Sequence, residues 1–128
     1  MTYEMSKTLD TSFQEAIDRV TAELQREGFG IITETDLKAK FKEKLNKDFR
    51  NYKILGACNP SLAYRALQAE DKIGTMLPCN VIVRKDDAGK TVVEFMDPNA
   101  VLQLVGRPEI GSIAAEVRSR LERVMAAL

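Results

Sequence analysis

Two short segments of the sequence hold its only cysteines, each beside asparagine and proline. The segments read Gly56-Ala-Cys-Asn-Pro60 and Leu77-Pro-Cys-Asn80. Each is expected at a junction between a strand and a helix. Cys58 should directly precede a helix N-terminus, where the helix dipole favours a thiolate over a thiol. Any binding pocket is therefore expected near Cys58, Asn59, Pro60, Pro78, Cys79 and Asn80.

The two cysteines allow more than one interpretation. Two thiolates can hold a soft monovalent metal such as Cu(I), or interconvert with a disulfide. A disulfide needs Cα atoms within roughly 7 Å, whereas one continuous helix over residues 61–76 would be about 24 Å long. Only a broken helix, or antiparallel flanking strands, would bring Cys58 and Cys79 together. Free cysteine is among the most buried residue types, so core packing is favoured over redox or soft-metal chemistry.

Other polar groups of the sequence are best explained as helix caps. Asn59-Pro60 and Asp97-Pro98 each place a capping side chain before a proline at the first helical position. The free N–H groups there can bind a phosphate or carboxylate, but every capped helix has such a terminus. Glu34 and Asp36 lie on one side of a strand and can act as an acid–base pair or bind a hard cation. Without a third ligand they are a poor metal site, and Asp36 is better explained as a cap.

Residues Lys38–Lys53 form a basic segment. Seven lysines and arginines stand there against Glu43 and Asp48, a local charge of +5. On a helix the lysines occupy two edges, with Phe41 expected to be buried between them. Such a patch can bind anions, nucleic acid or acidic lipid. Its aromatic residues do not interleave with the basic ones at stacking positions, so a solvated helix face is favoured and nucleic acid is not expected as a partner.

Composition excludes several classes of function. The 128 residues are 45% hydrophobic and 30% charged, which is ordinary for one soluble domain spanning residues 1–128. Nineteen basic residues balance nineteen acidic ones, so no global field attracts nucleic acid or an anionic membrane. The absence of histidine excludes Ser-His-Asp and Cys-His catalysis and histidine metal ligands. No apolar run spans a bilayer and no signal-peptide layout is present, so a cytoplasmic location is expected and no membrane partner.

Two long helices are expected to hold this site in place. An apolar stripe from Ile110 to Leu128, in steps of three and four residues, predicts a C-terminal helix. A helix is also expected over residues 12–27, with Ser12 and Glu15 as a capping box and Gly28 as a left-handed stop.

Strands and shorter helices are expected between the long helices. A helix from Ser61 to Leu77 is expected to be interrupted near Glu70-Asp71. Short helices should follow Asp36 and Asp97, and a hairpin should form around residues 86–89. The expected strands are Met1–Leu9, Ile31–Thr35, Tyr52–Ala57, Val81–Val83 and Thr91–Phe95. The pattern predicts an α+β fold, a two-layer sandwich with a mainly antiparallel sheet of about five strands and helices on one face.

Several segments together resemble a known family. The runs Tyr52–Leu67 and Ile73–Val81, with the Cys-Asn-Pro and Leu-Pro-Cys-Asn sequences, are similar to the domain of unknown function 302 family. Residues Phe29–Asp36, the lysine-rich helix, Asp97-Pro98 and the terminal helix extend the resemblance over essentially the whole chain.

The resemblance implies a TATA-binding-protein-like α+β arrangement, a homodimer, and a bacterial or archaeal family without an established activity. Its shared signatures are the Asn-Pro, Leu-Pro and Asp-Pro pairs, here Asn59-Pro60, Leu77-Pro78 and Asp97-Pro98. The two cysteines look like a subgroup feature, which argues against thiol chemistry as the common function of the family.

No catalytic constellation is recognisable in the sequence, and no cofactor is indicated. We therefore expect a small, homodimeric ligand-binding or interaction domain rather than an enzyme, with an unknown ligand. Thiol redox or soft-metal binding by Cys58 and Cys79 is the alternative. Anion or nucleic-acid binding through Lys38–Lys53 is a second and weaker alternative.

Overall fold

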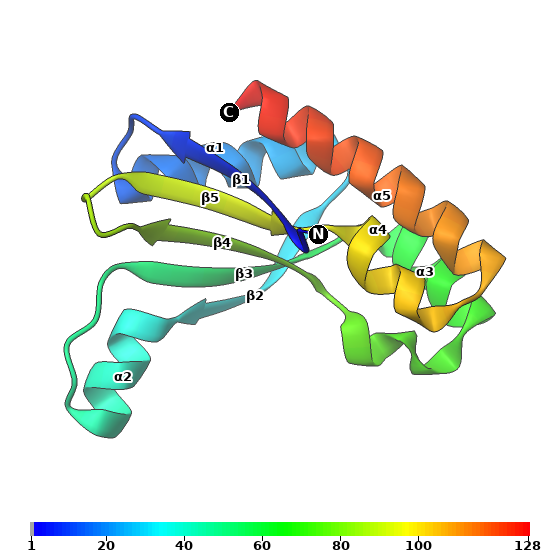
Figure 1. Ribbon diagram of the computed structural model, residues 1–128, viewed down its shortest axis with the longest axis horizontal. Coiled ribbons are helices and arrows are strands. Elements are labelled where there is room, and N and C mark those ends of the chain that lie inside the picture. Colours follow the sequence, from blue (N-terminus) through cyan, green and yellow to red (C-terminus); the bar gives the residue numbers. More distant parts are fainter. Residues whose placement is uncertain (1) are drawn as a thin grey trace.

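The computed structural model describes residues 2–128 as a five-stranded sheet with helices packed on one face (Figure 1). The strands are β1 (Glu4–Leu9), β2 (Gly30–Asp36), β3 (Tyr52–Cys58), β4 (Cys79–Lys85) and β5 (Thr91–Met96). The α-helices are α1 (Phe13–Arg26), α2 (Leu37–Leu45), α3 (Pro60–Ala69), α4 (Pro98–Val101) and α5 (Pro108–Ala127). Two 3₁₀ helices, η1 (Asp71–Met76) and η2 (Leu102–Val105), complete the chain.

The sheet has the strand order β1-β5-β4-β3-β2, and every neighbouring pair is antiparallel. The predicted α+β class, the five strands and the hairpin between β4 and β5 are confirmed. The first strand begins at Glu4 rather than at Met1, which lies outside the described residues. The likeness to the TATA-binding-protein arrangement stays a prediction.

Both long helices are confirmed: α1 has its predicted cap and stop, and α5 begins at Pro108, just before the predicted stripe. The Ser12 side chain accepts a hydrogen bond from the Glu15 N–H, and Gly28 adopts a left-handed φ of 87° after α1. In α5 the predicted apolar stripe is buried from Ile110 to Val124. The Lys7 ammonium of β1 donates to the last carbonyls of α5, at Met125 (3.1 Å) and Leu128 (2.9 Å), a favourable place for a cation.

The core lies between the sheet and the helices α1, α3 and α5. Its largest fully buried apolar side chains come from the sheet, α1, η1 and α5: Phe95, Leu24, Leu55, Ile73, Ile110, Leu121, Val20, Val81, Val83, Val93 and Val124. Few polar side chains are buried with them. Asn59 and Asp97 cap α3 and α4, as their Asx-Pro pairs predict.

Helix α2 departs from expectation. It projects from the sheet beyond the end of β2 (Figure 1), and none of its residues is buried. Phe41, expected to be buried, is only half-buried and packs edge-on against Phe49 at 5.0 Å between ring centroids, while Leu45 is 62% exposed. The reason is that Asp36 caps α2 beyond the edge of the sheet, where no second layer covers it.

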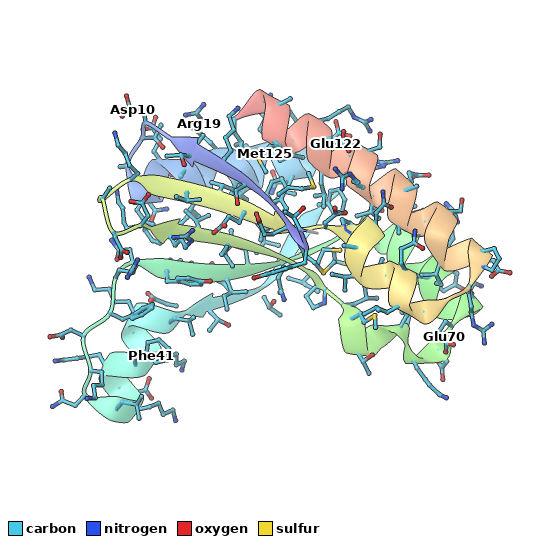
Figure 2. The ribbon with its side chains drawn as sticks, in the orientation of Figure 1. Asp10, Arg19, Phe41, Glu70, Glu122 and Met125 are labelled. Atoms are coloured by element: carbon cyan, nitrogen blue, oxygen red, sulfur yellow. The ribbon has the colours of Figure 1, made fainter. Side chains whose placement is uncertain are left out.

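The far face of the sheet is more polar than the helix-covered face. Across it, the Arg84 Nε donates to the Glu94 carboxylate at 2.6 Å, and the Ser6 hydroxyl donates to the same group at 2.8 Å. Burial opposes the ionisation of Glu94, but these hydrogen bonds outweigh it and lower the pKa of the carboxyl group. Figure 2 shows how side chains cover both faces of the sheet and the projecting α2.

Candidate functional site

The two cysteine segments meet at one end of the sheet. Strands β3 and β4 are antiparallel neighbours, with Ala57 opposite Cys79 and Gly56 opposite Asn80. Between them the chain leaves the sheet as α3, breaks at Glu70 and returns through η1. Both conditions for bringing Cys58 and Cys79 together, a broken helix and antiparallel strands, are thus met.

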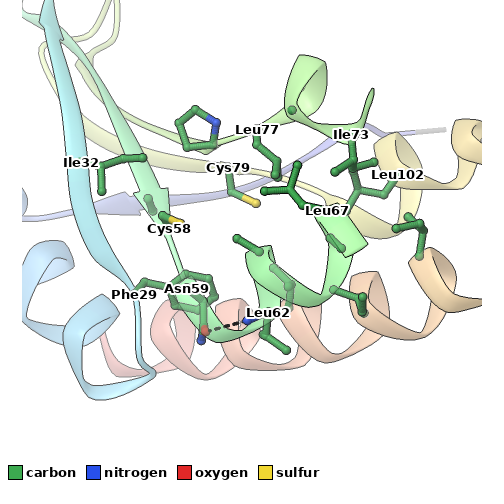
Figure 3. Close-up of a pocket in the computed structure, with 18 residues that line it drawn as sticks. Phe29, Ile32, Cys58, Asn59, Leu62, Leu67, Ile73, Leu77, Cys79 and Leu102 are labelled. Atoms are coloured by element: carbon green, nitrogen blue, oxygen red, sulfur yellow. Dashed lines mark hydrogen bonds between the residues drawn. The ribbon is translucent and has the colours of Figure 1, made fainter. Parts of the chain in front are cut away.

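A cavity of about 250 Å³ opens beside this junction (Figure 3). The end of the sheet, α3, η1, η2 and α5 all contribute to it. Its lining is Phe29, Ile32, Ala57, Cys58, Asn59, Leu62, Ala63, Ala66, Leu67, Ile73, Gly74, Leu77, Pro78, Cys79, Leu102, Ile110, Ile113 and Val117. No side chain of this set carries a charge. The cavity is therefore a hydrocarbon-lined pocket, of the kind that takes small apolar ligands.

The pocket brings together four of the six predicted site residues. Cys58, Asn59, Pro78 and Cys79 line it. Pro60 and Asn80 do not, and both are exposed. Pro60 occupies the first position of α3, and side chains alternate along a strand, which turns Asn80 away from the face that Cys79 occupies.

Asn59 is held by two hydrogen bonds within the protein. Its Oδ1 accepts from the Leu62 N–H at 3.3 Å, the predicted cap of α3, and its Nδ2 donates to the Glu27 carbonyl at 3.4 Å. The amide thus fixes the start of α3 against the end of α1. It serves as a structural wall of the pocket.

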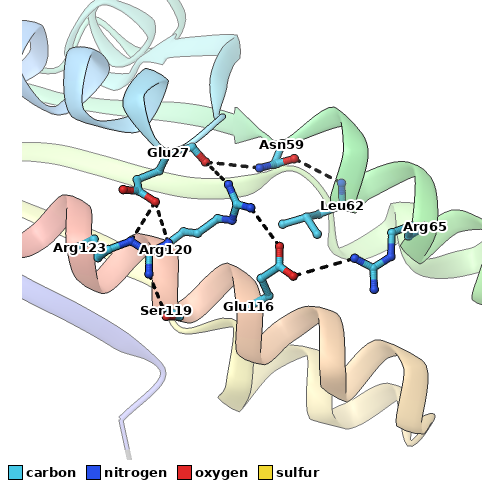
Figure 4. Close-up of polar contacts among 8 residues, drawn as sticks. All are labelled: Glu27, Asn59, Leu62, Arg65, Glu116, Ser119, Arg120 and Arg123. Carbon is cyan, nitrogen blue, oxygen red and sulfur yellow. Dashed lines mark hydrogen bonds and ion pairs between the residues drawn. The ribbon is translucent and has the colours of Figure 1, made fainter.

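The Glu27 carbonyl is also bound from α5 (Figure 4). The Arg120 guanidinium donates to it at 2.9 Å and pairs with Glu116 at 3.2 Å. Arg123 pairs with the Glu27 carboxylate at 2.8 Å, and this hydrogen bond is the main cause of the lowered pKa of Glu27. Three elements around the pocket, α1, α3 and α5, are joined at this point.

A bulge in β2 contributes a pocket residue that the sequence analysis missed. The register with β3 shifts between Ile31 and Thr33, which leaves Ile32 as an extra residue. Ile32 lines the pocket although it is 61% exposed. Bulges commonly redirect a side chain next to a functional site. The other missed residues are aliphatic apart from Phe29 and Gly74, and no chemical signature in the sequence distinguishes them from ordinary core.

The two thiols do not have the predicted ionisation. Burial raises the pKa of Cys58, and burial together with the neighbouring Cys58 raises the pKa of Cys79 to about 11. The expected thiolate at Cys58 is therefore wrong, because desolvation outweighs the helix dipole. Both cysteines are free, and residues 2–128 contain no group of three or more potential metal ligands among Cys, Asp and Glu. Thiol redox and soft-metal chemistry are not supported.

The other polar candidates take structural positions. Asp36 caps α2 by accepting from the Ala39 N–H at 3.0 Å, and Glu34 pairs with Lys53 at 2.8 Å. The basic segment Lys38–Lys53 covers α2, the following loop and the start of β3, and lies largely exposed. Anion or nucleic-acid binding by it is not supported.

Within the described part of the chain, no helix has the length and apolar character needed to cross a bilayer.

The comparisons with known proteins agree with this fold. The family described as "Domain of unknown function DUF302" matches residues 5–128. A solved structure, the crystal structure of uncharacterized conserved protein DUF302 from Bacillus stearothermophilus, is 28% identical in sequence, with a TM-score of 0.92. The match covers 99% of this chain and 98% of that one. No curated protein matches the chain.

Proposed function

The chain belongs to the DUF302 family, for which no activity is established, and from that premise we propose that it is a single binding domain for a small, largely apolar molecule. The ligand occupies the pocket beside Cys58, Asn59, Pro78 and Cys79. Pro60 contributes indirectly, because it sets the start of α3, and Asn80 lies beside the pocket.

The observation that carries this proposal is the 250 Å³ pocket with an uncharged lining. Most voids in protein interiors are no larger than a water molecule, because side chains interdigitate. A pocket of this size offers few hydrogen-bond partners to water and gains free energy when hydrocarbon fills it, at roughly 25 cal/mol per Å² of apolar surface covered. A large apolar pocket is the default place for a ligand.

The thiols contribute to this proposal as neutral groups. With raised pKa values, Cys58 and Cys79 stay protonated near neutral pH. A protonated cysteine behaves as a small hydrophobic side chain with a weak S–H donor. The pair therefore extends the apolar wall and needs no metal or oxidant.

The proposal is tested with a panel of uncharged apolar compounds beside charged metabolites of similar mass, assayed by thermal unfolding and calorimetry. Uncharged compounds should raise Tm and bind one per chain. Ala63 on α3 is half-buried and lines the pocket, so the larger side chain of Ala63→Leu should occupy part of the cavity and weaken binding at least tenfold. Ala22→Leu on the exposed face of α1 is the matched control and should bind as the wild type does.

Two outcomes would overturn the proposal. One is a panel in which only charged compounds bind. The other is binding that Ala63→Leu leaves unchanged, since the ligand would then lie elsewhere on the molecule. A second pocket variant, Leu67→Ala, tests the same site in case Ala63→Leu fails to fold, because Leu67 lines the pocket but is 41% exposed.

We also propose that the protein is a cytoplasmic homodimer. Both cysteines are free, which suits a reducing compartment. For self-association, α2 and its loop present Leu45 and Phe49 to solvent at 62% and 38% exposure. Residues 38–53 carry a charge of +5, and the carboxylates of Asp10, Glu15 and Asp18 lie exposed around the start of α1, so two copies can be complementary in charge.

Sedimentation equilibrium tests the dimer. The wild type should have twice the mass of the chain at micromolar concentration, and Leu45→Asp should be monomeric. The control Leu104→Asp alters an exposed leucine away from α2 and should remain dimeric. A wild-type monomer at all concentrations would exclude the homodimer and leave the pocket proposal intact.

A further inference from the structure

The pocket offers no partner to a charged or strongly polar group buried inside it. None of its lining residues is acidic or basic. Its polar side chains are Asn59, whose amide oxygen and nitrogen are both engaged within the protein, and the thiols of Cys58 and Cys79. A polar ligand group placed among them would lose its water without replacing those hydrogen bonds, which is costly.

The buried polar side-chain atoms that lack a partner belong to residues outside the pocket lining. Within residues 2–128, the buried side-chain N and O atoms without a partner are Thr11 Oγ1 and Arg120 Nε. Neither residue lines the pocket. Among the residues that line the pocket, no buried side-chain nitrogen or oxygen lacks a hydrogen-bond partner.

The volume limits how much hydrocarbon fits. A cavity of about 150 Å³ lined by Leu, Ile and Phe holds benzene, with six carbons. By proportion, a pocket of 250 Å³ holds about ten carbons. The lining has one aromatic ring, Phe29, among aliphatic side chains. Because the wall is aliphatic along most of its length, an alkyl chain can make hydrocarbon contacts throughout the pocket.

The mouth of the pocket lies at its most exposed residues. Ile32 on the β2 bulge and Leu67 on α3 line the pocket and are 61% and 41% exposed. Figure 3 shows both on elements that flank the cysteine pair. A polar group attached to a chain that fills the pocket can remain in water at this rim.

Resting on the proposed function, we infer that the ligand is a single-chain amphiphile whose alkyl chain of about ten carbons fills the pocket while its polar end stays in solvent between Ile32 and Leu67. The binding affinity therefore depends on the length of the alkyl chain and hardly on the charge of the polar end. Chain length and head charge are separate variables, so each can be tested alone.

Chain length is tested with 1-alkanols from 1-butanol to 1-dodecanol, by calorimetry on the full chain. Each added methylene should lower Kd about fourfold, the factor that corresponds to burial of one CH₂. The gain should stop near ten carbons, where the pocket is full. An affinity that does not depend on chain length would overturn the inference.

Head charge is tested with decanoate, 1-decanol and decylammonium at pH 7. On the wild type their Kd values should agree within about threefold. Leu67→Glu places a carboxylate at the mouth, so decylammonium should then bind about three- to fivefold more tightly than decanoate. Leu104→Glu is the matched control, because Leu104 is 78% exposed and lies outside the pocket lining; it should not separate the two ligands.

The results distinguish this inference from the proposed function. If compact uncharged compounds bind at the pocket and alkanols show no length dependence, the inference fails and the proposed function stands. If Leu104→Glu discriminates between the heads as Leu67→Glu does, the polar end does not lie at the proposed mouth. If no uncharged compound of either set binds, both fail.

Discussion

Replacing Gly56 by alanine tests the packing that forms the wall of the pocket. A Cβ added to Gly56 would lie 2.0 Å from the Thr33 hydroxyl oxygen and 2.7 Å from Cγ of Pro78. Contacts below 3.0 Å are essentially never seen for a real Cβ. The Thr33 side chain is exposed and can rotate, whereas the Pro78 ring can move only with its backbone.

Gly56→Ala should therefore destabilise the protein by about 1–3 kcal/mol, the usual cost of overpacking. It should also weaken binding of apolar ligands, because Pro78 is part of the pocket lining. The free energy of unfolding is measured by urea denaturation, and ligand affinity by calorimetry. The double variant with Thr33→Ala should recover part of the loss, since the contact with Pro78 remains.

Gly111→Ala is the matched control. Gly111 lies inside α5, and a Cβ there meets nothing within 4 Å. Alanine is a better helix former than glycine by about 0.5–1 kcal/mol, so this variant should be stabilised. If Gly56→Ala were as stable as Gly111→Ala, the close approach of Pro78 to β3 would be refuted.

Three further predictions concern charged groups and thiols. Arg118→Ala removes the ion-pair partner of the buried Asp97 carboxylate and should cost about 1–3 kcal/mol in urea denaturation; unchanged stability would contradict the pairing. Cys58 and Cys79 should react slowly with Ellman's reagent at pH 7, with Cys79 the slower, and the rates should rise toward the raised pKa values. A fast thiol at pH 7 would show the burial argument to be wrong. Although burial opposes ionisation of Glu94, hydrogen bonds hold its pKa below the ordinary 4.5. Its stabilising contribution is therefore full above that value and is lost as the pH falls through the lower folded pKa. Glu94→Gln should reduce the acid dependence of the unfolding free energy, and equal slopes for both proteins would speak against this role.

Much of the fold could be predicted because local signals and packing agree. The apolar stripe of α5 has the helical period, and its residues are those that the core buries. Ser12, Asn59 and Asp97 have the residue types that cap helices, and each accepts the expected backbone hydrogen bond. Such signals depend on a few neighbouring residues, so they can be read without the tertiary structure.

Helix α2 shows where local signals fail. Leu37, Phe41 and Leu45 have helical spacing, and the helix forms over Leu37–Leu45 as expected. Whether an apolar face is buried depends on what lies opposite, and nothing in the segment reveals that it extends past the edge of the sheet. The expected burial of Phe41 was wrong for that reason.

The candidate site could be predicted in part. Cysteine and Asx-Pro residues marked the junction of β3, α3 and β4, and four of the six proposed residues line the pocket. The bulge that frees Ile32 depends on pairing between two strands, and no residue type announces it. The protonation of the thiols depends on burial, which local sequence does not determine.

The most direct test of the account is methyl NMR during titration with the tightest-binding uncharged compound of the panel. A ligand in the pocket should give saturable shifts at the methyl groups of Ile73 and Ile113, which line the pocket, with none at Leu45 and Leu104, which lie outside it. Shifts confined to Leu45 or Leu104, or the absence of any saturable shift at Ile73 and Ile113, would contradict a ligand in this pocket.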